Sequence, residues 1–195
     1  MTRRWTLRLT ACLMAGVAAL TGCSEKQEAS ETLPTTSSPA PSEDALPPLG
    51  PEDLPMPDEA RTQDAAGAEA FVRYYFELMN KSLTDMDPRY IRLLSDGSCE
   101  VCDRIASETE TDAAAGYSYR GGDLTIPGDV SVKLSGPDQA EMAFVADQAP
   151  MTVLDGAGDP VPELVFSGID VLNSGAISVW DEADSTWKLV ELTLG

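Results

Sequence analysis

Hydrophobic positions with a helical repeat dominate residues 64–83. The apolar side chains recur at intervals of three and four residues: Phe71, Tyr75, Leu78 and Met79. This spacing predicts an amphipathic helix with an aromatic buried face. Charges of alternating sign stand four residues apart on the opposite face and predict successive ion pairs: Glu69, Arg73, Glu77 and Lys81. Two shorter helices are expected over 88–94 and over 98–116, the latter with Ser98 as N-cap.

The hydrophobic repeat changes to two after Gly121 and Gly122, which is typical of half-buried strands. Strands are predicted over 130–134, 140–145, 151–154, 164–172, 176–180 and 187–194. Turn-forming residues separate the last runs at 155–156, 173–175 and 181–185. Helices followed by antiparallel strands predict an α+β fold. In it, one long aromatic helix and two shorter helices pack on one face of a curved antiparallel sheet.

The N-terminus combines basic residues with a short apolar run over 9–20. This run is shorter than the roughly 20 residues that a membrane-spanning helix needs, but it suits a signal peptide. Leu20-Thr21-Gly22-Cys23 follows at its end and resembles the lipobox of bacterial lipoproteins. The resemblance implies that residues 1–22 are a signal peptide and that Cys23 carries a diacylglyceryl anchor. We therefore expect the protein on the outer face of the cell membrane.

Residues 23–60 are acidic, rich in Ser and Thr, and contain 8 of the chain's 14 prolines. A segment with no aromatic residue and only scattered leucines buries too little surface to offset its ordering entropy. We expect a disordered tether here and a single globular α+β domain over 61–195.

Composition excludes several functions. The 13 basic residues stand against 33 acidic residues, a net charge of −20, which disfavours nucleic acid as a partner and keeps an exported domain soluble. The chain has no histidine, so Ser-His-Asp sites, Cys-His sites and His-containing zinc sites are ruled out. We expect no cofactor, no metal, and a monomer or weak dimer.

The order of elements, ending in Trp-Lys-Leu-Val at 187–190, resembles nuclear-transport-factor-2-like folds. Pro-Met-Pro at 55–57, Gly-Ala-Glu-Ala-Phe-Val-Arg-Tyr-Tyr at 67–75 and Cys-Glu-Val-Cys at 99–102 resemble a narrower family. That family comprises uncharacterised actinobacterial lipoproteins defined only as a domain of unknown function. The likeness to nuclear-transport-factor-2-like folds implies a cone-shaped pocket between the first helix and the sheet, and some members of that fold are isomerases or dehydratases that use buried acids. The likeness to the lipoprotein family implies a fold and a location, and it carries no known catalytic residues.

Cys99 and Cys102 are the cysteines that remain once Cys12 is cleaved away and Cys23 is lipidated. Outside the membrane such a pair predicts a disulfide that stabilises the start of the third helix. A thiol-disulfide redox centre is the alternative, although acidic neighbours disfavour a reactive thiolate. A metal site is a weaker alternative because two thiols supply only half a ligand set.

Two further sets of residues are candidates for a site between helix and sheet. Asp170 shares a strand face with Phe166 and Leu172, so an inward-facing Asp170 would be an acid or base with a raised pKa; the alternative places it at the rim or in solvent. Aromatic side chains are candidates to line a cavity, or else to form plain core: Tyr74, Tyr75, Phe144, Phe166 and Trp180.

These observations predict a non-enzymatic, membrane-anchored lipoprotein that binds a small apolar ligand or a cell-envelope protein. A small isomerase or dehydratase that uses Asp170 is the second hypothesis, and a redox partner that uses Cys99 and Cys102 is the third.

Overall fold

A computed structural model describes residues 48–195, while the predicted signal peptide, Cys23 and the first part of the predicted tether lie outside the described residues. The helical elements come first: η1 (Asp58–Arg61), α1 (Ala65–Asp85), α2 (Arg89–Leu93) and α3 (Glu100–Ala114). Eight strands follow: β1 (Ser118–Gly121), β2 (Leu124–Thr125), β3 (Ser131–Leu134), β4 (Gln139–Gln148), β5 (Met151–Leu154), β6 (Pro160–Phe166), β7 (Ile169–Asp181) and β8 (Thr186–Leu194). No helix among the described residues is long and apolar enough to cross a membrane.

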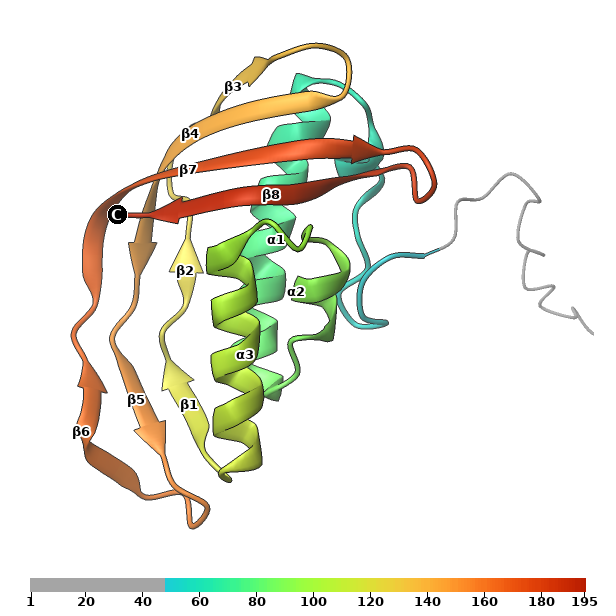
Figure 1. Ribbon diagram of the computed structural model, residues 1–195. Coiled ribbons are helices and arrows are strands. Elements are labelled where there is room, and N and C mark those ends of the chain that lie inside the picture. The colour runs from blue at the N-terminus through green and yellow to red at the C-terminus, as the bar shows by residue number, and fades with distance from the viewer. Residues whose placement is uncertain (1–47) are drawn as a thin grey trace, which may run out of the picture. The chain divides into compact units, whose positions relative to one another are not determined.

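The strands form one curved antiparallel layer, and the helices pack on its concave face (Figure 1). In one part of the layer the order is β2-β4-β7-β8, and β3 pairs with β4 along the same edge as β2; in the other part the order is β1-β5-β6. The chain runs from β1 into β2, from β4 into β5 and from β6 into β7, so three long strands pass from one part to the other. The predicted α+β fold class, with helices on a curved antiparallel sheet, is confirmed.

The core lies between α1 and the sheet. Phe71 and Tyr75 of α1 are fully buried, as the aromatic repeat predicts. Phe76 packs edge-on against Phe144 of β4, with 5.4 Å between the ring centroids. Burying a large apolar side chain contributes about 1.5–3 kcal/mol, so this face alone accounts for much of the attachment of α1 to the sheet.

The helix boundaries differ from the prediction by one or two residues. Asp64 caps α1, because its Oδ1 accepts a hydrogen bond from the Gly67 N–H at 2.7 Å. The N-cap of α3 is Cys99, one residue beyond the predicted Ser98. On α1 the Glu69–Arg73 ion pair forms at 2.9 Å. Two other carboxylates, rather than Glu77, hold Lys81 at 2.7 Å each: Asp53 and Asp85.

The strand prediction missed β1 and β2 and misplaced two breaks. The predicted turn at 173–175 lies inside β7, where Asn173 and Gly175 pair with Val145 and Ala143 of β4. The predicted strand over 164–172 is interrupted after Phe166, so its two halves belong to different strands, β6 and β7. Pairing with β4 on one side and β8 on the other outweighs the local turn preference of Asn-Ser-Gly.

The last residues of the predicted tether belong to the folded domain. Met56 is 7% exposed, its N–H donates to the Leu49 carbonyl at 2.7 Å, and the Thr186 hydroxyl lies 3.2 Å from its Sδ. The Tyr74 hydroxyl donates to the Leu54 carbonyl at 2.9 Å. The predicted domain start at residue 61 is therefore too late by about a dozen residues. The few apolar side chains of this segment pack against α1 and β8.

Candidate functional site

A pocket of about 290 Å³ opens between α1, α3 and the concave face of the sheet. Its apolar lining comes from all three parts of the fold: Met79, Leu83, Ile105, Leu124, Met151, Ile169, Leu172 and Leu194. Its polar lining lies mainly on α3 and β1: Arg104, Glu108, Thr109, Tyr119 and Gln148. We call this space the inner pocket. Its volume is at the small end of the range for ligand sites, and its wall is mostly apolar, as such sites usually are.

A second pocket, of about 410 Å³, continues along α3 toward the free edge of β6. It shares three lining residues with the inner pocket: Glu108, Tyr119 and Met151. Val153, Leu164 and Phe166 of the sheet form one wall, and the opposite wall is the polar face of α3. We call this space the outer pocket. The shared residues make the two pockets adjoining parts of one groove.

The groove exists because the three long strands all bend at one level. Gly121 and Gly122 separate β1 from β2, and both have positive φ angles, 74° and 88°, which glycine adopts without steric cost. A Cβ on Gly121 would lie 2.3 Å from the Pro150 carbonyl oxygen, at the break between β4 and β5. A Cβ on Gly168, between β6 and β7, would lie 2.7 Å from the Gln148 carbonyl oxygen. Glycine at these positions lets neighbouring backbones approach closely and the sheet curve away from α3.

The bend at β7 also holds a residue in an unfavourable conformation. Val171 has a φ of 65°, a region that β-branched residues rarely adopt. Its N–H donates to the Asp147 side chain at 3.0 Å, which holds the backbone in place. Ile169 and Leu172, on either side of this residue, both line the inner pocket. The strained backbone therefore lies at the rim of the site.

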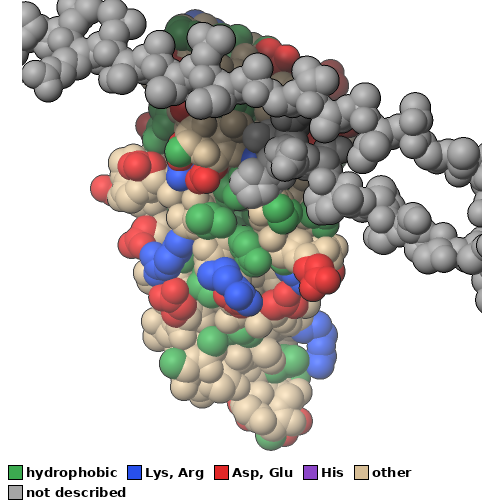
Figure 2. All heavy atoms as spheres, turned by 90° about the vertical axis from the view of Figure 1, so that its right-hand side faces the viewer, with side chains coloured by type: hydrophobic (Ala, Val, Ile, Leu, Met, Phe, Trp, Pro, Cys, Tyr) green, Lys and Arg blue, Asp and Glu red, His purple; other side chains and the backbone are tan. Residues whose placement is uncertain are grey.

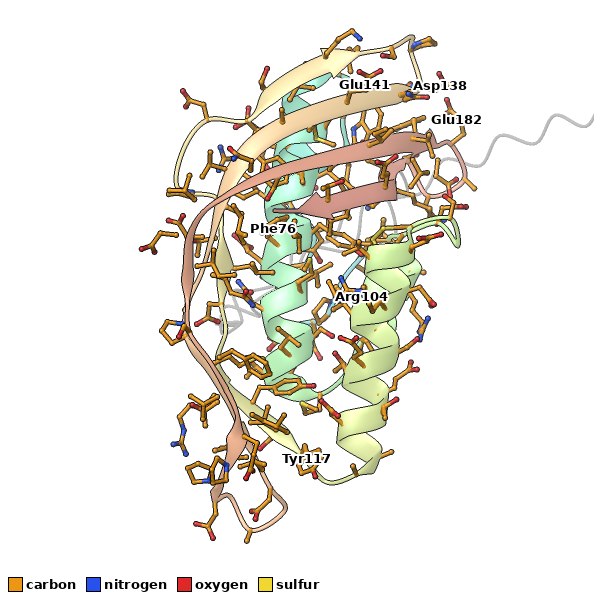
Figure 3. All side chains as sticks on the ribbon, turned by 60° about the vertical axis from the view of Figure 1, so that its left-hand side comes forward. Phe76, Arg104, Tyr117, Asp138, Glu141 and Glu182 are labelled. Carbon is orange, nitrogen blue, oxygen red and sulfur yellow. A yellow bond between two sulfur atoms is a disulfide. The ribbon has the colours of Figure 1, made fainter. Side chains whose placement is uncertain are left out.

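Polar groups of the groove are fixed mainly by one another. The Tyr119 hydroxyl donates to the Asp112 carboxylate, and burial, reinforced by this contact, raises the pKa of Tyr119. Arg104 lies 4.0 Å from Glu108 one turn along α3, and both side chains are more than half exposed. Figure 3 shows Arg104 on α3 beside α1 and Tyr117 beyond the C-terminal end of α3. The arrangement offers hydrogen bonds and charge along one wall of the groove.

The five predicted pocket residues separate into three groups. Tyr74, Tyr75 and Phe144 are buried in the core, and burial raises the pKa of both tyrosines. Trp180 is half-buried and packs edge-on against Trp187 at 5.4 Å between centroids. Phe166 is 47% exposed and lines the outer pocket.

Asp170 is exposed, which contradicts its proposed role as a buried acid or base. The bend at Val171 breaks the alternation of β7, so Ile169 and Leu172 face the pocket and Asp170 faces solvent. The isomerase or dehydratase hypothesis thereby loses its catalytic carboxyl.

Cys99 and Cys102 form the predicted disulfide at the start of α3. Both residues are only 1% exposed, and Cys99 Sγ accepts a hydrogen bond from the Cys102 N–H at 3.3 Å. A buried disulfide is poorly placed for exchange with another protein's thiol, because exchange requires access for the attacking thiolate. Among residues 48–195, no group of three or more carboxylate or cysteine side chains could hold a metal ion.

The face that carries α2 offers less than the groove. Figure 2 shows acidic and basic side chains side by side on this face. Arg92 of α2, for example, lies 2.5 Å from Asp103 and 3.0 Å from Glu110 of α3. Charges paired in this way join α2 to α3.

Sequence reasoning missed most of the groove lining. Ile105 and Thr109 of α3 lie one turn apart and both line the inner pocket, while Leu124 belongs to a strand that was not predicted. In the sequence the Gly121-Gly122 pair indicates a boundary between helices and strands, whereas in the structure it lies at the bend of the sheet beside the pocket.

No protein-family model matches the chain, and no curated protein does. Solved structures with a similar fold include the intermembrane space region of the chloroplast protein ARC6, at 17% identity and a TM-score of 0.49; the match covers 68% of this chain and 97% of that one. A nuclear transport factor 2 (NTF2-like) superfamily protein from Salmonella enterica matches at 12% identity and a TM-score of 0.46, over 68% of this chain and 92% of the other. An NTF2-like protein of unknown function in nutrient uptake from Rhodospirillum rubrum matches at 15% identity and a TM-score of 0.41, over 64% and 96%. At these identities the likeness is one of fold alone.

Proposed function

We propose that the domain binds a small apolar ligand in the inner pocket and acts as a binding protein rather than an enzyme. The observation that carries this proposal is the wall of eight apolar side chains from α1, α3 and four strands, which leaves about 290 Å³ open to solvent. A pocket of this kind gains binding free energy in proportion to the apolar area it removes from water, at about 25 cal/mol per Å².

The walls of the inner pocket belong to the rigid part of the fold. Met79 and Leu124 are almost fully buried at its base, and Thr109 is held because its hydroxyl donates to the Ile105 carbonyl at 2.8 Å. The Asn80 side chain fixes β2 to α1, because it donates to the Leu124 carbonyl and accepts from the Leu124 N–H, both at 2.8 Å. A preformed pocket loses little conformational entropy on binding.

We further propose that the domain belongs to the actinobacterial lipoprotein family described above and is anchored through Cys23. Residues 24–47 would then hold the groove near the outer face of the membrane. The anchor is tested by Cys23→Ala, which is expected to release the protein from the membrane fraction into the medium. Retention of this variant in the membrane would contradict the anchor and leave the pocket proposal untouched.

The binding proposal is tested by titrating a protein that comprises residues 43–195 with the uncharged apolar dye N-phenylnaphthylamine, whose fluorescence rises in apolar surroundings. Ile105→Trp fills the inner pocket from α3 and is expected to weaken dye binding at least about tenfold, since about 1.4 kcal/mol of lost contact corresponds to tenfold. Leu172→Trp fills it from the sheet and provides an independent variant.

Leu93→Trp is the matched control, because Leu93 is an exposed leucine of α2 outside the groove. The control adds the same indole at an exposed position, so it separates filling of the inner pocket from a general effect of an added tryptophan on the domain. Failure of the dye to bind the unmodified domain, or equal binding by all three variants, would overturn the proposal.

A further inference from the structure

We infer that the ligand is an elongated alkyl amphiphile whose tail occupies the inner pocket and whose cationic or hydrogen-bond-donating head lies in the outer pocket. This inference rests on the proposed function and extends it from a pocket to a groove. It assigns a role to the outer pocket, to Phe166 and to the acidic face of α3.

The shape of the groove favours an elongated ligand. Ile105 lines the inner pocket and Asp112 lines the outer one, seven residues further along the same helix. At a rise of 1.5 Å per residue they stand about 10 Å apart along the axis of α3. Met151 and Tyr119 line both pockets and join them. A compact ring would fill the inner pocket alone, whereas an alkyl chain spans both.

The two walls of the outer pocket differ in chemistry. The sheet contributes Met151, Val153, Leu164 and Phe166, which are all apolar. The helix contributes Ser107, Glu108, Thr111 and Asp112, which are all polar. A chain of methylenes fits against the first wall, and a polar head finds acceptors on the second. Phe166 is 47% exposed at the edge of β6, a large aromatic surface that a bound chain would cover.

The charges of the groove favour a cationic or uncharged head over an anionic one. Glu108 and Asp112 are the acidic lining residues of the outer pocket, which has no basic residue in its lining. Arg104 lies in the lining of the inner pocket, close to Glu108. An anionic head beside Glu108 and Asp112 would be repelled, and the chain's net charge of −20 adds to this preference.

The test is displacement of N-phenylnaphthylamine from the domain by three compounds below their micelle concentrations. Hexyltrimethylammonium and dodecyltrimethylammonium differ in chain length, and dodecyl sulfate reverses the charge of the head. Each buried methylene contributes up to about fourfold in affinity, so the dodecyl cation is expected to bind at least about tenfold more tightly than the hexyl cation. Dodecyl sulfate is expected to bind more weakly than the dodecyl cation.

Two sets of variants separate the outer pocket from general effects. Phe166→Ser is expected to weaken the dodecyl cation at least about threefold and to leave the hexyl cation unchanged. Its matched control is Val165→Ser, because adjacent strand residues face opposite sides of the sheet. Glu108→Gln is expected to reduce the preference for the cation over the sulfate about two- to fivefold, as for a partly exposed ion pair. Glu100→Gln removes the same charge from α3 outside the groove and is expected to leave the preference unchanged.

The inference and the proposed function fail in different ways. Dye that binds the inner pocket and is displaced equally by both chain lengths, with no effect of Phe166→Ser, would overturn the elongated ligand and leave the apolar pocket standing. Preference for dodecyl sulfate, or equal effects of Glu108→Gln and Glu100→Gln, would overturn the assignment of the head. Absence of dye binding would overturn the proposed function itself.

Discussion

Met56→Ala tests whether residues 48–60 are part of the folded domain. The Met56 side chain is 7% exposed and lies against Thr186 of β8, while its backbone N–H binds the Leu49 carbonyl at 2.7 Å. Truncation of a buried methionine to alanine costs about 2–5 kcal/mol. Because this residue lies at the edge of the core, where neighbours can close part of the cavity, we expect about 2 kcal/mol.

The assay is urea unfolding of residues 43–195, followed by tryptophan fluorescence, since Trp187 is buried in the same core. With a slope of about 1–3 kcal/mol per molar urea, a loss of 2 kcal/mol lowers the urea midpoint by about 1 M. Glu52→Ala is the matched control, because Glu52 is exposed in the same segment and such surface changes stay within about 0.5 kcal/mol. Equal stabilities for both variants and the unmodified domain would show that the segment is tether, as the sequence predicted.

Three further outcomes are expected. Replacement of both Cys99 and Cys102 by alanine is expected to lower the free energy of unfolding by about 2 kcal/mol, the loop-closure value for so short a ring; no change in urea midpoint would refute a stabilising disulfide. Basic partners hold the pKa values of three carboxyl groups below their ordinary range: Asp53, Glu110 and Asp181. A carboxyl group whose pKa is lowered in the folded state stabilises the domain at pH values above its unfolded pKa, near 4. This stabilisation is lost as the pH falls through the lower pKa of the folded state. Thermal unfolding scans are therefore expected to show constant stability from about pH 7 to 5 and a decline below about pH 4. Val171→Gly is expected to destabilise the domain by at least about 1 kcal/mol less than Val165→Gly, because of these two valines Val171 is the one with a positive φ. The opposite order of stabilities in urea unfolding would show that the bend carries no strain.

Local sequence signals predicted the helices well because their determinants are local. Asp64 lies three residues before the N–H that it caps, and the aromatic repeat of α1 records directly which face is buried. The fold class followed from the change of hydrophobic repeat after Gly122. These features depend on neighbours within one or two helical turns.

The errors arose where distant contacts decide the structure. Asn173 has a strong turn preference, yet pairing with Val145 of β4 keeps it in the middle of β7. Met56 lies in a segment whose composition indicates disorder, yet β8 supplies a place for its side chain from 130 residues away. Asp170 faces solvent because the backbone bends at Val171, which interrupts the strict alternation on which its inward orientation depended.

The candidate site was the least predictable part because it is a space between packed elements, and its position depends on how those elements meet. Tyr74 and Tyr75 follow the helical repeat into the core, as most aromatic stripes do. Phe166 lines the groove because β6 belongs to the part of the sheet that curves around α3. The positions of Gly121 and Gly168, which permit this bend, become meaningful once the strands that approach them are known.

The most direct test of ligand binding between α3 and the sheet is methyl NMR of residues 43–195 during titration with N-phenylnaphthylamine. We expect chemical-shift changes in the methyl groups that line the inner pocket: Ile105, Leu124, Ile169, Leu172 and Leu194. We expect no change at Leu93 and Leu134, which are exposed leucines elsewhere on the domain. Changes centred on Leu93 or Leu134, or no change at any methyl group at saturating dye, would show that the dye does not bind between α3 and the sheet.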